Sequence, residues 1–216
     1  MTMSQNESGR KLLEKAYMLE SPEDNISYYD KLADSYDQDF ADGLGYALPQ
    51  AVAQTFRAIS TGTDSPVIDV GCGTGLLADA LDSPNLHIDG LDISDAMLRL
   101  AYEKKRYRKF YKVDLTKPLD SNIYDYGAVL SCGTFTHGHL GPDALVSLLD
   151  VAKKSALFIL SINHEHYCKR GFEAVINTLV EENKIIDPKC NELNIYNVAG
   201  HEHSDDLGVI VSFRKV

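Results

Sequence analysis

A glycine-rich segment in the middle of the chain has the residue types and spacing to hold a polar ligand. Asp69-Val70-Gly71-Cys72-Gly73-Thr74-Gly75 follows the apolar run 67–70 and precedes the helical pattern 76–81. Glycines allow positive φ and let a ligand approach the backbone closely. The helix that follows presents free N–H groups and the positive end of its dipole. The segment therefore predicts a ligand site at the carboxyl end of a strand.

The position of the acid and the glycines separates two classes of ligand. A dinucleotide loop reads GxGxxG and places a pyrophosphate on the helix N-terminus. Here the pattern is DxGxGxG, so that Gly75 comes one residue early and Asp69 directs a carboxylate at the loop. A carboxylate repels pyrophosphate, but it suits a cationic ammonium group held directly or through water.

Two further acids close the next predicted strands. Asp92 ends the run 87–92, and an acid at this place can accept hydrogen bonds from both hydroxyls of a ribose. Asp114 ends the run 111–114, where it could accept from the amino group of an adenine. An ammonium group, a ribose and an adenine together describe S-adenosylmethionine.

The elements that position these acids alternate between strand and helix. Strands are predicted over 67–70, 87–91, 110–113, 126–130, 156–162, 192–197 and 209–213. Helices are predicted over 11–19, 49–59, 76–81, 94–103, 141–153 and 171–182, with another opening at Ser21-Pro22. This order indicates an α/β protein with a mostly parallel sheet and helices on both faces. The last two strands have no helix between them, so we expect a hairpin with the last strand antiparallel.

The same motifs resemble those of class I S-adenosylmethionine-dependent methyltransferases, with Leu91-Asp92-Ile93-Ser94 and Asp114-Leu115 as the later motifs. The stretch 29–37, YDKLADSYD, resembles a helix of small-molecule members such as the quinone-biosynthesis and Williams-Beuren-region methyltransferases. The resemblance covers residues 27–215. It implies a Rossmann-like seven-stranded sheet in the order 3-2-1-4-5-7-6 with strand 7 antiparallel. It also implies a single domain, 1–216, with an N-terminal helical lid (1–60) on a cofactor-binding core (61–216).

The resemblance implies roles for three groups of residues, with S-adenosylmethionine as cofactor and S-adenosylhomocysteine as product. The methionine part would be held by Asp69, Gly71, Gly73, Gly75 and Ser131. The ribose and adenine would be contacted by Asp92, Ile93, Met97, Asp114 and Leu115. The lid would place Tyr29 and Tyr36 over the cofactor.

The histidines are the candidates for acid–base chemistry. Six of them form three His-x-His pairs, at 137/139, 164/166 and 201/203, in connections that we expect at the carboxyl edge of the sheet. They could be polar residues around a cleft. Alternatively His137 or His164 could be a general base, because an unperturbed histidine titrates near neutral pH. The pairs have metal-ligand types without a recognised spacing, and no metal site is predicted.

Composition and charge limit the partners and the location that we expect for this protein. The 216 residues include 21 Lys and Arg and 32 Asp and Glu, a net charge of −11 that disfavours nucleic acid and anionic membranes as partners. The polar start 1–10 is not a signal peptide, and 156–162 is too short to span a bilayer. The basic run 104–109 is interpreted as a solvated helix end, with an anion site as the alternative. We expect a cytoplasmic monomer or homodimer.

Together these observations predict an enzyme that transfers a methyl group from S-adenosylmethionine to O, N or S of a small molecule. One alternative is a protein that binds S-adenosylmethionine without catalysis. A second is a nicotinamide-dependent oxidoreductase, against which Asp69 and the early Gly75 argue. A polyamine synthase would share the fold, but the chain is short for one.

Overall fold

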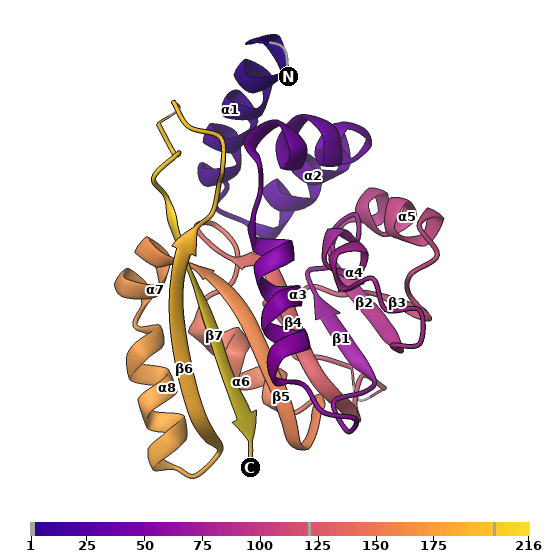
Figure 1. Ribbon diagram of the computed structural model, residues 1–216, viewed down its shortest axis with the longest axis vertical. Helices are drawn as coiled ribbons and strands as arrows, with labels where there is room; N and C mark the ends of the chain where they lie inside the picture. The colour runs from indigo at the N-terminus through magenta and orange to yellow at the C-terminus, as the bar shows by residue number, and fades with distance from the viewer. Residues whose placement is uncertain (1–2, 121, 201) are drawn as a thin grey trace.

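Seven strands form one twisted sheet in the computed structural model, which describes residues 3–120, 122–200 and 202–216 (Figure 1). The strands are β1 (Val67–Val70), β2 (Ile88–Asp92), β3 (Lys109–Lys112), β4 (Tyr126–Phe135), β5 (Ala152–Asn163), β6 (Ile185–Asn194) and β7 (Leu207–Lys215). Their order is β3-β2-β1-β4-β5-β7-β6. Only β7 runs antiparallel to its neighbours, β5 and β6. The predicted fold class, order and hairpin are confirmed.

Helices cover both faces of the sheet because successive strand residues point to opposite sides. The helices after β1 are α4 (Leu76–Leu81), α5 (Asp95–Glu103), α6 (Pro142–Leu149), α7 (His164–Arg170) and α8 (Phe172–Glu181). On β5, Ile159 packs in the cluster with α3 and α4, whereas Leu160 packs in the cluster with α6 and α8. No helix in the described part of the chain is long and apolar enough to cross a membrane.

Three N-terminal segments lie over the carboxyl ends of the parallel strands, at the top of Figure 1: α1 (Met3–Tyr17), α2 (Pro22–Ser35) and the π-helical turn η1 (Tyr36–Asp42). The next helix, α3 (Leu48–Ile59), packs on one face of the sheet beside α4. The hydroxyl of Ser21 caps α2 by accepting from the N–H of Asp24, and Pro22 occupies the first turn. We call α1, α2 and η1 the lid helices.

Three predicted elements differ from the structure for physical reasons. The sixth strand begins at Ile185 rather than 192, because it is a solvent-exposed edge strand with a polar sequence and no apolar signal. The segment after β5, expected as a loop, is the short helix α7, capped by Asn163. The sixth helix ends at Leu149 rather than 153, since β5 already begins at Ala152.

One buried carboxylate joins three strands at the β3 side of the sheet. Asp89 on β2 is 1% exposed and receives two hydrogen bonds of 2.9 Å from the guanidinium of Arg108, just before β3. The hydroxyl of Tyr126 on β4 donates to the same carboxylate at 2.8 Å. A buried carboxylate with a full set of donors fixes the register of the strands around it.

We expect Asp89→Ala to lower the free energy of unfolding by about 1–3 kcal/mol, because the buried hydroxyl of Tyr126 loses its acceptor. Urea titration followed by circular dichroism measures the change. The matched control is Asp95→Ala, whose ion pair with Lys112 is exposed and should contribute under about 1 kcal/mol. An equal loss in the two variants would contradict this assignment.

Candidate functional site

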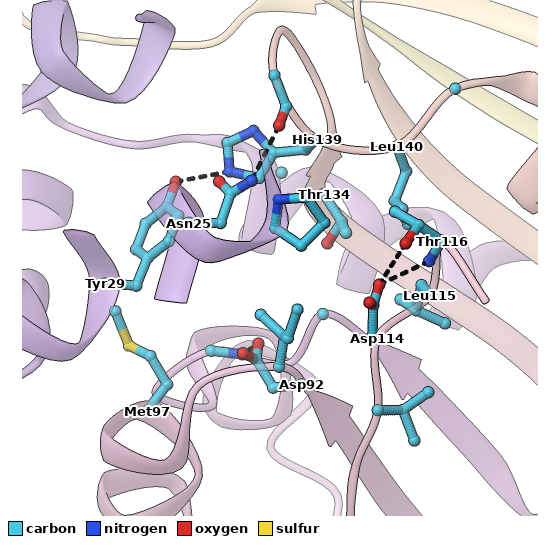
Figure 2. Close-up of a pocket in the computed structure, with 18 of the residues that line it drawn as sticks. Asn25, Tyr29, Asp92, Met97, Asp114, Leu115, Thr116, Thr134, His139 and Leu140 are labelled. Atoms are coloured by element: carbon cyan, nitrogen blue, oxygen red, sulfur yellow. Dashed lines mark hydrogen bonds between the residues drawn. The ribbon is translucent and has the colours of Figure 1, made fainter. Parts of the chain in front are cut away.

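A cavity of about 320 Å³ lies between the carboxyl edge of the sheet and the lid helices (Figure 2). It brings together nine residues that the sequence predicted to bind a cofactor. They are Tyr29, Tyr36, Gly71, Gly73, Asp92, Ile93, Met97, Asp114 and Leu115. Three others, Asp69, Gly75 and Ser131, do not line it.

Asp69 is buried at the end of β1, beside a smaller cavity of about 40 Å³ that adjoins the glycine loop. The hydroxyl of Tyr107 donates to its Oδ2 at 2.7 Å. Its Oδ1 is buried and has no hydrogen-bond partner among the described residues. Burial raises the pKa of this carboxyl to about 7; the Tyr107 hydrogen bond lowers it, and the charge of Asp92 raises it. The site therefore holds one carboxylate oxygen ready for a cationic donor.

Tyr107 is the functional-site residue that the sequence interpretation missed. It lies in the basic run 104–109, and its ring passes over two glycines to reach Asp69. A Cβ would stand 3.1 Å from this ring at Gly75 and 3.2 Å at Gly90. Gly75, with φ of 92°, thus makes room for the tyrosine rather than facing the large cavity. An aromatic residue inside a charged run was the available signal.

Close approach of a neighbouring side chain requires a glycine at the start of the loop but not at its centre. Gly71 has φ of 68°, and a Cβ there would stand 2.0 Å from Oγ1 of Thr134. The hydroxyls of Thr134 and Ser131 both donate to the carbonyl of Val70, at 3.0 and 2.8 Å. Ser131 is thus used to tie β4 to the end of β1. Gly73 has φ of 52°, and a Cβ there would meet nothing within 4 Å.

The other two predicted acids both face the large cavity. Asp92 accepts from the N–H of Gly73 at 2.8 Å and of Ser94 at 2.9 Å, and burial raises its pKa. Asp114 accepts from the N–H and the hydroxyl of Thr116, as Figure 2 shows, and forms an ion pair with Lys117. Although burial opposes it, these donors hold the pKa of Asp114 below its usual value.

In the stretch 29–37, at the end of α2 and the start of η1, the tyrosines and the aspartates make different contacts. Tyr29 and Tyr36 line the large cavity, and burial raises the pKa of both hydroxyls, so that both are neutral donors at physiological pH. Their aspartate neighbours, Asp30 and Asp37, instead contact the cofactor-side loops. The motif therefore attaches α2 and η1 to the core while its rings cover the cavity.

Two of the three aspartates of this stretch, Asp30 and Asp37, contact the start of a helix. Asp30 accepts from the hydroxyl of Ser94, the cap of α5, at 2.5 Å. Asp37 accepts from the hydroxyl of Thr74, next to the first turn of α4, and from Lys104 at 2.7 Å. Negative charge is stabilised at a helix N-terminus, so these contacts attach α2 and η1 to the starts of α5 and α4 beside the cavity.

The two histidines predicted as catalytic lie outside the large cavity, whereas His139 and His166 line it. His137 is 3.6 Å from Glu165, and its Nδ1 is buried without a partner among the described residues. His164 begins α7 and is 3.3 Å from Glu192 on β6. His139 faces the cavity, and His201 lies outside the described residues. Within the described chain, no three His, Cys, Asp or Glu side chains are grouped closely enough to hold a metal ion.

The sheet order and the glycine loop with its following acids define a nucleotide-binding α/β enzyme of the methyltransferase type. Comparisons with known proteins agree. Residues 67–157 match the family described as "Methyltransferase domain". The human protein "Methyltransferase-like protein 27" is 32% identical over 167 residues, which cover 74% of this chain and 68% of that protein.

Solved structures share the fold at low identity. The CcbJ methyltransferase from Streptomyces caelestis superposes with a TM-score of 0.59 at 15% identity, covering 88% of this chain and 98% of its own. Magnesium protoporphyrin IX methyltransferase from Synechocystis PCC 6803, solved with bound S-adenosylmethionine, gives 0.53 at 20% identity and 77% of each chain. The chain belongs to the class I S-adenosylmethionine-dependent methyltransferases. It is an enzyme of methyl transfer, and S-adenosylmethionine is its cofactor.

The glycine loop should respond very differently to a methyl group at Gly71 and at Gly73, which both have positive φ. Gly73→Ala adds only backbone strain, so we expect a loss of about 1–2 kcal/mol in the free energy of unfolding. Gly71→Ala adds a clash with Thr134, for a total of about 2–5 kcal/mol. Thermal and urea unfolding measure both. The double variant Gly71→Ala/Thr134→Ala should recover part of the loss, and no recovery would contradict the clash.

Proposed function

We propose that this chain methylates a small molecule, with S-adenosylmethionine lying in the 320 Å³ cavity under the lid helices. The observation that carries the proposal is the buried, unpartnered Oδ1 of Asp69 beside a glycine loop. Such an oxygen suits the ammonium group of the cofactor, whereas a pyrophosphate would be repelled. The same feature argues against a nicotinamide cofactor.

In this proposal each part of the cofactor meets a matching group of the chain. Asp69 accepts from the ammonium group, and Gly71 and Gly73 allow the backbone to approach the methionine part. Asp92 accepts from the ribose, and Asp114 accepts from the adenine amino group. Apolar contacts with the adenine come from Ile93, Met97 and Leu115. The sulfonium supplies an already activated methyl group, so the chain contributes largely by orienting the two reactants.

We further propose that residues 1–60 act as a lid and residues 61–216 as the cofactor-binding core of one domain. The contacts of Asp30 and Asp37 with the starts of α5 and α4 support this division. The net charge of −11 favours a small molecule over nucleic acid as acceptor. The acceptor atom is O, N or S, and the enzyme acts in the cytoplasm as a monomer or homodimer.

Cofactor binding should weaken as the pH falls through the titration of Asp69. The carboxylate form binds the ammonium group, and with a pKa of about 7 half of it is protonated at pH 7. Calorimetry of S-adenosylmethionine should then give a Kd about fivefold higher at pH 6 than at pH 7. Absence of measurable binding at pH 7 would overturn the proposed function.

Two variants connect this pH dependence to Asp69. Tyr107→Phe removes the hydrogen bond that lowers the Asp69 pKa, so binding should weaken at pH 7 and recover at higher pH. Asp69→Asn should weaken binding and flatten the pH profile between pH 6 and 7. The matched control is Tyr102→Phe, at an exposed tyrosine. This variant should leave the Kd of S-adenosylmethionine and its pH profile unchanged.

The lid contacts can be tested by hydrogen exchange. We expect Asp30→Ala/Asp37→Ala to lower the free energy of opening of α2 and η1 by about 1–3 kcal/mol, because the hydrogen bonds from Ser94, Thr74 and Lys104 to these two carboxylates are lost. Amide exchange of residues 22–42 should accelerate accordingly. Asp34→Ala is the control, since its pair with Arg99 is exposed at both ends. Unchanged exchange in the double variant would contradict the lid contacts.

A further inference from the structure

His139 lies on a connection that the structure fixes in place between β4 and α6. The side-chain amide of Asn25 donates to the carbonyl of Gly138 at 2.9 Å. Gly138 has φ of 73°, and a Cβ there would stand 1.7 Å from the carbonyl oxygen of Leu19. One residue further on, the carbonyl of Leu140 is 2.8 Å from Nε2 of His166. The imidazole of His139 is therefore held against α2 rather than carried on a free loop (Figure 2).

The hydrogen bonds of His139 define which ring nitrogen carries the proton. Nδ1 is 2.8 Å from the carbonyl oxygen of His137, which can only accept, so Nδ1 must donate. In the neutral ring Nε2 is then the acceptor, and it lies 3.1 Å from the hydroxyl of Tyr29. Tyr29 donates to it, as the dashed line in Figure 2 marks. A basic lone pair is thereby aimed at a tyrosine hydroxyl on the lid.

The surroundings of His139 keep the ring neutral. Burial lowers its pKa below the usual value, and the charges of His166 and His137 lower it further, against the hydrogen bond to the His137 carbonyl. Tyr29 faces it from α2 as a neutral hydroxyl. The charged side chains that line the same cavity are Glu20, Asp92, Asp114 and Arg170.

His139 and Tyr29 line both the large cavity and another cavity of about 40 Å³. We call this one the second cavity; it is distinct from the cavity of similar volume beside Asp69. The second cavity lies between the lid helices, β4 and the end of β6. Its aromatic lining consists of Tyr17, Tyr29, Tyr36, Phe40, Tyr46, Phe135 and Tyr196. Its lining contains no Asp, Glu, Lys or Arg side chain among the described residues. Such a cavity selects an uncharged, flat and apolar guest, which would displace some of these rings as it binds.

We propose that Tyr29 and His139 form a proton relay that deprotonates an uncharged aromatic acceptor admitted to the second cavity. The proposal rests on the proposed function and names the acceptor class for that site. As the acceptor heteroatom bonds to the methyl carbon, the carbon–sulfur bond breaks and its electron pair stays on sulfur. The acceptor proton passes to the Tyr29 oxygen while the Tyr29 proton passes to Nε2 of His139. A neutral acceptor thus gives a neutral methylated product and an imidazolium.

The first test measures the histidine directly and needs no turnover. Two-dimensional ¹H–¹⁵N spectra of the imidazole ring, assigned with His139→Gln, should show a neutral Nδ1–H tautomer at pH 7. Its titration midpoint should lie below 6.5. An Nε2–H tautomer, or an imidazolium at pH 7, would overturn the relay.

The second test compares two probe acceptors at pH 8 in single-turnover assays. Phenol retains its proton there and needs a base, whereas thiophenol is already largely ionised. We expect His139→Gln to slow phenol methylation by about 10²–10⁴-fold and thiophenol methylation by less than about threefold. Tyr29→Phe should slow phenol methylation similarly, and the double variant should be no slower than either single one.

The controls separate this proposal from the proposed function. The Kd of S-adenosylhomocysteine and the unfolding midpoint of His139→Gln should match the unaltered enzyme. His87→Gln, at an exposed histidine before β2, should leave both rates unchanged. Equal loss on both probes, or methylation of thiophenol alone by the unaltered enzyme, overturns the relay. Methylation of neither probe overturns the acceptor class, whereas loss of cofactor binding in the unaltered enzyme would refute the proposed function itself.

Discussion

The buried carboxylate of Asp69 is the constraint around which this end of the sheet is arranged. Burying a carboxylate is costly unless donors surround it, and here a single tyrosine hydroxyl serves one of the two oxygens. To deliver that hydroxyl, the Tyr107 ring must cross Gly75 and Gly90, where any side chain would collide with it. Gly75, which the sequence predicted as a ligand contact, and Gly90 thus make room for the ring that holds the acid, and the second carboxylate oxygen has no partner among the described residues.

The same electrostatic rule explains how the lid is attached. Asp30 and Asp37 place negative charge against the starts of α5 and α4, where the helix dipoles are positive. Lys104, which interacts with both Asp37 and Asp79, adds a cation between the lid and α4. These polar contacts lie beside an apolar one, because Leu13 of α1 and Phe40 of η1 are buried in the same apolar cluster as residues of β4 and β5.

Local pattern predicted the mostly parallel sheet, the final hairpin, the glycine loop and the acids at strand ends, whereas the strand order and the remaining cavity residues were implied by the resemblance to methyltransferases. Strand runs, a glycine loop and acids at strand ends need only the parallel arrangement to meet at one edge. An aromatic residue in a basic run marks Tyr107 as unusual, but its contact with Asp69 depends on the space at Gly75 and Gly90, which no local pattern predicts. Nor does the sequence indicate that His139 rather than His137 lines the cavity. The start of β6 was not predicted, because this exposed edge strand lacks the alternation of apolar and polar residues that marks a half-buried strand.

The distribution of charge across the two cavities matches the needs of methyl transfer. A sulfonium carries its positive charge into the reaction and loses it as the methyl group leaves, so the transition state with a neutral nucleophile has more dispersed charge than the reactants. In the proposed arrangement, acids would bind the ends of the cofactor and fix its position, whereas a carboxylate aimed at the sulfonium would stabilise the concentrated charge of the ground state and slow the reaction. Asp92 and Asp114 line the large cavity, and the described lining of the second cavity contains no carboxylate. This distribution would let the acids contribute to cofactor binding without opposing methyl transfer.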